Sequence, residues 1–247
     1  MALVFESGLL VYSESDAVIE QLEMIFQVWD TLCTKYGCRS QSGVAYTVYT
    51  RNGSYWDAID AVRRAWWGES KPTSTSLVTN RLPDGRNWGK DKIAMEAVGV
   101  TGECEKREIY LDSPSNVSTY CHAKVVEDKT SKRVFFSGVV ALGSCWKDQP
   151  GGEVDMWVIS RDIDVQVHYC LRNIEGLCRK AEVTKQGVKK MDIFHDRSLD
   201  TAKTATIVAQ VRESYPNADL FLRPVDGFRD FKTPILVEIR PHAVVWK

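Results

Sequence analysis

The apolar residues of this chain follow two alternating spacings, one typical of helices and the other of strands. Between residues 21 and 33 they recur every three or four positions, which predicts an amphipathic helix. Residues 44–50 form a β-branched and aromatic run, which predicts a strand. We expect a second helix around 54–67 and an apolar closing strand at 92–100. Ahead of the first helix, Val-Phe-Glu-Ser-Gly at 4–8 is typical of a strand that enters a turn.

The same order of elements recurs in the second half of the chain. The matching elements are a strand at 134–138, a helix at 166–178, a strand at 188–194, a helix around 198–214 and a closing strand at 235–245. Asp200 or Ser198 is expected to cap the last helix. Because the elements agree in order as well as in kind, they indicate a duplicated domain rather than a coincidence.

One insertion distinguishes the lengths of the two copies. Val4 and Val134 are 130 positions apart, whereas Gln21 and Gln166 are 145 positions apart. The extra residues fall within 142–162, where Pro-Gly-Gly marks a loop.

This order of strands and helices predicts an α+β fold made of two fused domains, residues 1–103 and residues 104–247. Each domain is expected to hold a mixed β-sheet with two helices on one face. The other face of each sheet would be apolar and uncovered. We therefore expect it to pack against another sheet, either across the repeats or between chains.

Composition and charge narrow the range of functions. The 247 residues include 32 basic and 33 acidic side chains, a balance that gives no field for collecting nucleic acid or an anionic membrane. No stretch approaches the length of about 18 uncharged apolar residues that a membrane span needs. Seven cysteines without Cys-x-x-Cys spacing favour reduced thiols and a cytoplasmic location. Histidines without zinc spacing, and the lack of a glycine-rich phosphate loop, indicate neither a metal nor a nucleotide cofactor.

Several segments resemble motifs of the Rid family, small reactive-intermediate deaminases with a chorismate-mutase-like α+β fold. Residues 113–126 look like the family's opening segment, 134–138 like its Val-Phe-x-Ser-Gly strand, and 236–239 like its closing strand. In the first copy, Asn-Arg-Leu-Pro at 80–83 is similar to the family's Ala-Arg-Leu-Pro. The resemblance covers nearly the whole chain as two tandem units, and it implies a site in a cleft between neighbouring domains.

The resemblance also implies roles for individual residues of the second copy. Arg223 would hold the carboxylate of an imino or enamino acid. Glu238, fifteen positions after Arg223, would orient the hydrolytic water. Tyr120 and the serine of the Ser-Gly pair, Ser137, would line the pocket and take part in catalysis.

The first copy departs from the family pattern at these positions. Ala94 stands where the second copy has Glu238, and the Thr-Ser-Thr-Ser of 73–76 stands where an arginine is expected. The opening segment is absent as well. We therefore expect the first copy to be structural, supplying a wall for the cleft of the second.

A weaker resemblance links the C-terminal part to chorismatases. Asp226, Arg229 and Glu238 follow an order similar to the last site motif of those enzymes, although the cysteine of that motif is missing. Asp226 and Arg229 are therefore further candidates for substrate binding, and Arg229 is an alternative to Arg223 as the anchor. The large leading region of chorismatases is absent, which argues against chorismate itself and leaves a cyclic carboxylate open.

The leading hypothesis is a cofactor-independent enzyme of specialised metabolism that hydrolyses or isomerises a small carboxylated imine, enamine or enol. One alternative is a chorismatase-like hydrolase, lyase or cyclase that acts on a cyclic carboxylate. The other is a non-catalytic small-molecule-binding or assembly protein. Because three Rid domains close a ring and one chain supplies two, we expect a homo-oligomer, first a trimer and second a dimer.

Overall fold

A computed structural model of the chain describes residues 2–12, 14–111, 119–141, 160–228 and 234–247. The first half contains β1 (Leu3–Val11), α1 (Val18–Lys35), β2 (Gly43–Thr50), α2 (Trp56–Trp67), β3 (Thr73–Val78) and β4 (Ile93–Thr101). The second half contains β5 (Glu105–Ile109), β6 (Ala123–Glu127), β7 (Ser131–Phe136), α3 (Ile163–Ala181), β8 (Val188–Asp196), α4 (Thr201–Ser214), β9 (Asp219–Val225) and β10 (Val237–Trp246).

These elements build two mixed sheets, each with two helices on one face, as the sequence predicts. The strand order is β1-β4-β2-β3 in the first sheet and β5-β6-β7-β10-β8-β9 in the second. In each sheet one pair is parallel, β2 with β3 and β8 with β9, and the other neighbours are antiparallel. The order β1-β4-β2-β3 is repeated as β7-β10-β8-β9, and β5 and β6 extend the second sheet.

Two buried glutamines show that the duplication extends to individual hydrogen bonds. Gln21 of α1 accepts a bond from Lys92 N at 2.9 Å, and Gln166 of α3 accepts one from Leu236 N at 2.8 Å. Both side chains are fully buried and each donates to two backbone carbonyls. Each glutamine therefore fastens the segment that leads into the last strand of its copy, which satisfies backbone groups that would otherwise be buried without partners.

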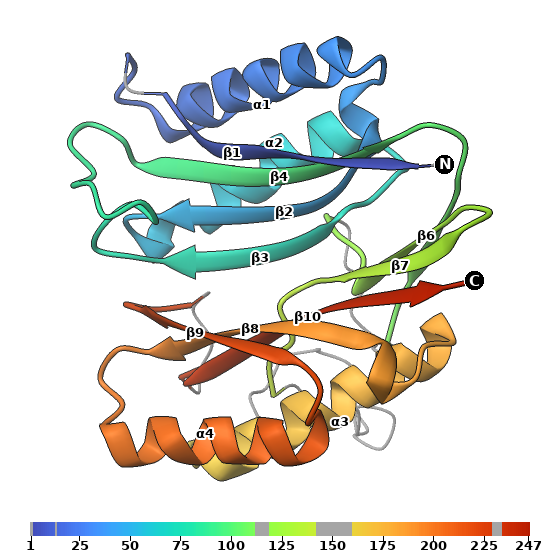
Figure 1. The fold of residues 1–247 in the computed structure, drawn as a ribbon. Helices are drawn as coiled ribbons and strands as arrows, with labels where there is room; N and C mark the ends of the chain where they lie inside the picture. Colours follow the sequence, from blue (N-terminus) through green and yellow to red (C-terminus); the bar gives the residue numbers. More distant parts are fainter. Residues whose placement is uncertain (1, 13, 112–118, 142–159, 229–233) are drawn as a thin grey trace, which may run out of the picture.

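The helix-free faces of the two sheets meet each other. In Figure 1 the sheets lie between α1 at the top and α3 and α4 at the bottom. Val44 and Ala45 of β2 pack in one apolar cluster with Val126 of β6 and Phe135 of β7. All eight positions of β2 are buried, because helices cover one of its faces and the second sheet covers the other. The expected packing of uncovered faces thus occurs across the repeats.

The sequence prediction misses two strands that the structure contains, β3 and β9. β3 has the polar sequence Thr-Ser-Thr-Ser-Leu-Val, yet its first three residues are buried. β9 contains Pro224 and is mostly exposed. It lies at the edge of its sheet, where a proline without an N–H group is tolerated.

A second correction concerns the Ser-Gly pair of the first copy, which does not end a strand. β1 continues to Val11, with a register shift between Glu6 and Leu9. Gly8 has a φ of 67°, a backbone conformation that suits glycine, and Ser7 Oγ accepts a hydrogen bond from Ala97 N at 2.9 Å. The pair therefore forms a bulge inside β1.

Other sequence expectations are met or fall outside the described residues. Asp200 caps α4 by accepting a bond from Lys203 N at 2.8 Å, whereas Ser198 lies before the cap. The greater part of the insertion at 142–162 lies outside the described residues. Among the helices of the described ranges, none combines the length and apolar character that crossing a membrane requires.

Candidate functional site

Glu238 is a buried carboxyl group on β10, with 6% of its surface exposed. It occupies the space beside Gly138, because a Cβ atom at that glycine would lie 1.4 Å from Glu238 Oε1. Burial raises the pKa of Glu238 from 4.5 to about 8, against the opposing charge of Arg240. The group is therefore mostly protonated at neutral pH and can give a proton as well as take one.

Asp192 of β8 is the centre of a basic cluster on the same sheet. Its Oδ2 accepts a bond from Arg240 Nη2 at 3.0 Å and lies 3.2 Å from His242 Nε2. Its Oδ1 accepts from Arg223 Nε at 3.2 Å and lies 3.3 Å from Lys190 Nζ. The carboxylate itself is fully buried. Two guanidinium groups and an ammonium group thus surround one negative charge, which leaves this face of the sheet with a surplus of positive charge.

The protonation states of the cluster follow from burial and from these contacts. Burial on its own would raise the pKa of Asp192, but His242, Arg240 and Lys190 lower it well below its ordinary range. Burial lowers the pKa of His242, and the bond with Asp192 offsets this only in part. At neutral pH we therefore expect Asp192 to be ionised and His242 to be neutral.

Strand register places Arg223 and Glu238 on one face of the sheet. Phe194 of β8 pairs with Glu238 on one side and with Arg223 on the other. Paired residues point to the same face, and neighbouring strands lie about 4.8 Å apart, so the two Cα atoms are separated by about 10 Å. In the adjacent row Arg240 pairs with Asp192. The two predicted groups thus share one surface, together with a second arginine that the prediction did not include.

The first sheet supplies polar groups to the same region. Arg240 Nη1 donates a hydrogen bond to Thr47 Oγ1 of β2, which joins the two sheets directly. Two positions further along β2, the hydroxyl of Tyr49 donates to Glu96 Oε2 at 2.8 Å. Thr75 of β3 pairs with Thr47 and is buried. We call this region the polar seam, made of Thr47, Tyr49, Thr75 and Glu96 from the first sheet and Asp192, Arg223, Glu238 and Arg240 from the second.

Register also identifies what the first copy has in place of the candidate catalytic pair. Ala94 pairs with Tyr49 as Glu238 pairs with Phe194, which agrees with the assignment of Ala94 made from the sequence. Tyr49 pairs in turn with Leu77, so Leu77 occupies the position of the arginine. The sequence predicts this position within 73–76, whereas the strand register puts it one residue further along β3, at Leu77.

The remaining residues predicted from the sequence lie in different surroundings. Ser137 is near Glu238 through the adjacent Gly138, but its hydroxyl donates to Cys121 O at 2.6 Å and accepts from Ser74 N at 2.9 Å. Tyr120 is half-buried, with its ring edge against His122. Ser137 is therefore held by backbone groups beside the end of β7, and Tyr120 packs against His122.

Asp226 is not part of the seam cluster. It accepts bonds from Arg197 Nε at 2.8 Å and from Asn80 N at 2.6 Å, so its carboxylate ties the two copies together. Arg229 lies outside the described residues. Of the two arginines proposed as carboxylate anchors, Arg223 alone lies within the described residues.

Sequence reasoning missed Asp192, although a signal was present. The aspartate stands in a predicted strand between Met191 and Ile193, both fully buried. A charge in such a run must be paired, since an unpaired buried carboxylate costs several kcal/mol. Its partners come from distant strands, so the sequence could not name them.

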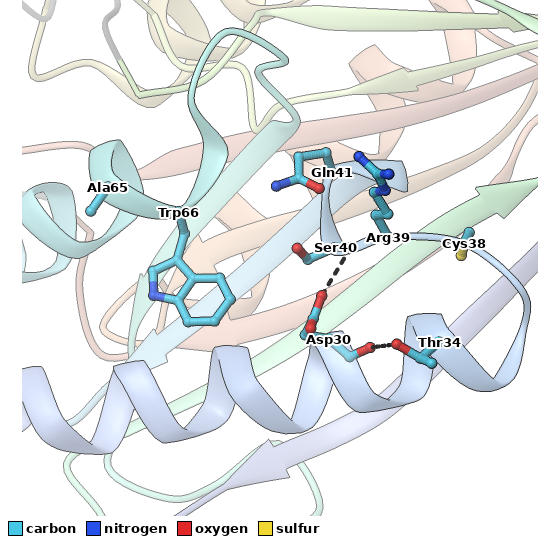
Figure 2. A pocket seen from close by; sticks show the side chains of 8 residues that line it. All are labelled: Asp30, Thr34, Cys38, Arg39, Ser40, Gln41, Ala65 and Trp66. Atoms are coloured by element: carbon cyan, nitrogen blue, oxygen red, sulfur yellow. Dashed lines mark hydrogen bonds between the residues drawn. The ribbon is translucent and has the colours of Figure 1, made fainter.

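A separate pocket of about 500 Å³ lies on the first copy, away from the predicted residues. Figure 2 shows Trp66 of α2 on one side and Asp30 of α1 below, with Arg39 and Gln41 opposite the indole. Asp30 Oδ1 accepts a bond from Ser40 N at 3.2 Å, and the Trp66 ring stacks on Phe26. The pocket contains no general acid or base of the seam. Across the described ranges, no three His, Cys, Asp or Glu side chains gather in a metal-binding group.

Comparison with solved structures decides the fold. A crystal structure of chorismatase superposes with a TM-score of 0.64 at 14% identity, covering 98% of this chain and 74% of that one. The chain has the fold of chorismatase. At this identity the likeness establishes the fold alone, and it confirms the two-domain α+β prediction.

Two further structures match about half of the chain. A Rid-family protein of Yersinia pestis has a TM-score of 0.44 at 18% identity and covers 57% of this chain and 100% of its own. TdcF of E. coli has a TM-score of 0.42 at 18% identity and covers 56% and 98%. Both scores are too low to support an argument about this chain. No protein-family model matches the chain, and no curated protein matches it either.

Proposed function

We propose that this chain is an enzyme that hydrolyses a small carboxylated imine or enamine at the polar seam. The observation that carries the proposal is the shared sheet face of Glu238 and Arg223, where a buried acid lies near a surplus of positive charge. Isomerisation of a related enol would use the same acid and the same anchor.

Arg223 is the proposed anchor for the carboxylate of the substrate. Its Nε donates a hydrogen bond to Asp192. Because the side chain is 44% exposed, a ligand can reach the guanidinium. An arginine binds a carboxylate through parallel hydrogen bonds, which fixes orientation as well as adding attraction. Asp192 holds the guanidinium in place before the ligand arrives.

Glu238 is the proposed acid and base. In its protonated form it gives a proton to the imine nitrogen, and the resulting carboxylate then accepts a proton from the water that attacks the imine carbon. Glu238, protonated again by that step, gives its proton to the amino nitrogen of the carbinolamine. The carbon–nitrogen bond then breaks, ammonia leaves, and the hydroxyl proton returns to the Glu238 carboxylate as the carbonyl forms. A pKa near working pH suits a group that must act in both directions.

Freshly generated 2-aminoacrylate tests this proposal, because pyruvate formation above the spontaneous rate reports hydrolysis. We expect Glu238→Gln to reduce the enzyme-dependent rate by about 10²–10⁴-fold, the usual contribution of one acid/base group. Arg223→Met should raise KM more than it lowers kcat. Glu213→Gln, at an exposed position of α4, is the matched control. Full turnover by a folded Glu238→Gln variant would remove Glu238 from the mechanism.

A chorismatase-like reaction on a cyclic carboxylate is the second candidate. The superposition over 98% of the chain favours it. Incubation with chorismate distinguishes the two candidates. Consumption of chorismate without turnover of 2-aminoacrylate would establish the second candidate and exclude imine hydrolysis.

A further inference from the structure

Glu96 and Thr47 of the first sheet occupy the positions that Arg240 and Asp192 occupy in the second sheet, but their side chains differ in charge. Arg240 pairs with Asp192 in the second sheet, and Glu96 pairs with Thr47 in the first. Because Arg240 also donates to Thr47, the two rows lie against each other. The duplication has therefore put a carboxylate on one wall of the seam where the other wall carries a guanidinium.

Tyr49 holds this carboxylate in position. Its hydroxyl donates to Glu96 Oε2 at 2.8 Å, and only 4% of the tyrosine is exposed. Burial raises the pKa of Tyr49, and the charge of Glu96 raises it further, so the hydroxyl remains a donor. Arg240 and Arg223 both bond to Asp192, and Arg240 also bonds to Thr47 on the same strand as Tyr49, so both guanidinium groups lie along the polar seam. Glu96 is half-buried and keeps acceptor positions beyond the one that Tyr49 uses.

Two buried polar atoms next to this row lack partners. Within the described residues, Thr75 Oγ1 and Arg240 Nε make no hydrogen bond. Thr75 pairs with Thr47 and so continues the row that starts at Glu96. Buried polar groups are nearly always hydrogen-bonded in folded proteins, so these two atoms are open to a water molecule or a polar ligand in the seam.

We propose that Glu96 accepts a hydrogen bond from the nitrogen of the ligand whose carboxylate Arg223 holds. The seam then selects zwitterionic amino or imino acids over simple carboxylates. A zwitterion matches the positive surplus of one wall and the carboxylate of the other. A hydroxy acid offers Glu96 a neutral hydroxyl donor in place of an ammonium group, and it carries a net negative charge into the seam. The inference rests on the proposed function for its anchor, and it makes Glu96 a specificity-determining residue contributed by the copy that lacks Glu238.

Calorimetric binding of L-alanine and L-lactate tests the inference, because the two ligands differ in an ammonium group against a hydroxyl. We expect the wild-type protein to bind alanine at least tenfold more tightly than lactate. Glu96→Gln should weaken the binding of alanine by about tenfold and leave the binding of lactate unchanged or make it tighter. Tyr49→Phe should shift the preference in the same direction, because Glu96 loses the bond that orients it. Glu6→Gln, at an exposed position of β1, should change neither ligand.

The outcomes separate this inference from the proposed function. If the wild-type protein binds both ligands without preferring alanine, the role of Glu96 is wrong while the anchor stands. If Glu96→Gln weakens the binding of alanine and of lactate equally, with an unchanged melting temperature, Glu96 does not distinguish the ammonium group from the hydroxyl. If the wild-type protein binds neither ligand, Arg223 is not an anchor and both proposals fail.

Discussion

Replacing Glu238 by glutamine should make the stability of the protein less dependent on pH. The pKa of Glu238 is raised to about 8 in the folded chain, whereas the unfolded chain returns it to about 4.5. Between these values the folded state keeps a proton that the unfolded state releases. The free energy of unfolding must therefore fall as pH rises from about 4.5 to about 8, and remain level above that range.

The size of this effect follows from the pKa difference. Each pKa unit corresponds to about 1.4 kcal/mol, so a rise from 4.5 to about 8 gives about 5 kcal/mol. That is a large part of the stability of a typical domain, about 5–15 kcal/mol. Glutamine has the same shape and no proton to lose, so the variant should show no such decline from this position.

Urea denaturation of both proteins between pH 4.5 and pH 9 measures the effect. Taking the difference between wild-type and variant removes the contribution of other titrating groups to a first approximation. We expect Glu238→Gln to gain several kcal/mol relative to the wild type across this range. A difference that stays constant with pH would refute the reasoning, because it would mean that Glu238 titrates alike in the folded and unfolded states.

Three other predictions rest on the contacts described above, and a fourth on the expected ring of domains. Gly138→Ala should destabilise the protein by about 1–3 kcal/mol and reduce turnover strongly, because its methyl group displaces the Glu238 carboxyl; unchanged urea midpoints and rates would contradict this. Asp192→Asn should cost about 3–5 kcal/mol and raise KM, because its basic partners lose their common counter-charge; a purely kcat effect would contradict it. Gln166→Ala should speed hydrogen exchange at Leu236 N and lower the free energy of unfolding by about 1–3 kcal/mol. Unchanged protection of this amide would contradict the role of the Gln166 hydrogen bond. Light scattering should give 84 kDa for a trimer of 28.0 kDa chains, and a species of 28 kDa alone would exclude a homo-oligomer.

Local pattern was enough to predict the helices and most of the strands. The stripe of apolar residues at 21–33 lies within α1, and its counterpart at 166–178 lies within α3, because helical spacing is a property of neighbouring positions. β3 escaped prediction for the opposite reason. Its residues are mostly polar, and Thr75 is buried because the second sheet covers its face of the strand, which no local pattern reveals.

The residues of the candidate site likewise fall into those that the sequence could predict and those that only the fold reveals. Arg223 and Glu238 could be proposed from the resemblance of one C-terminal segment, and register places them on one face. Asp192, Thr47 and Glu96 could not be assigned, because their roles depend on contacts between strands that are far apart in sequence. The Thr47 and Arg240 pair spans 193 positions, so only the folded chain brings it together.

The account depends most directly on the protonation of Glu238 next to a carboxylate anchor. Carbon-13 NMR of the glutamate side chains, with Glu238→Gln to assign the resonance, measures this pKa in the intact protein. We predict a value of about 8 in the free protein, and a higher value with pyruvate bound because a second negative charge lies nearby. A resonance that titrates near 4.5 and does not respond to pyruvate would contradict both the buried acid and its place in the site.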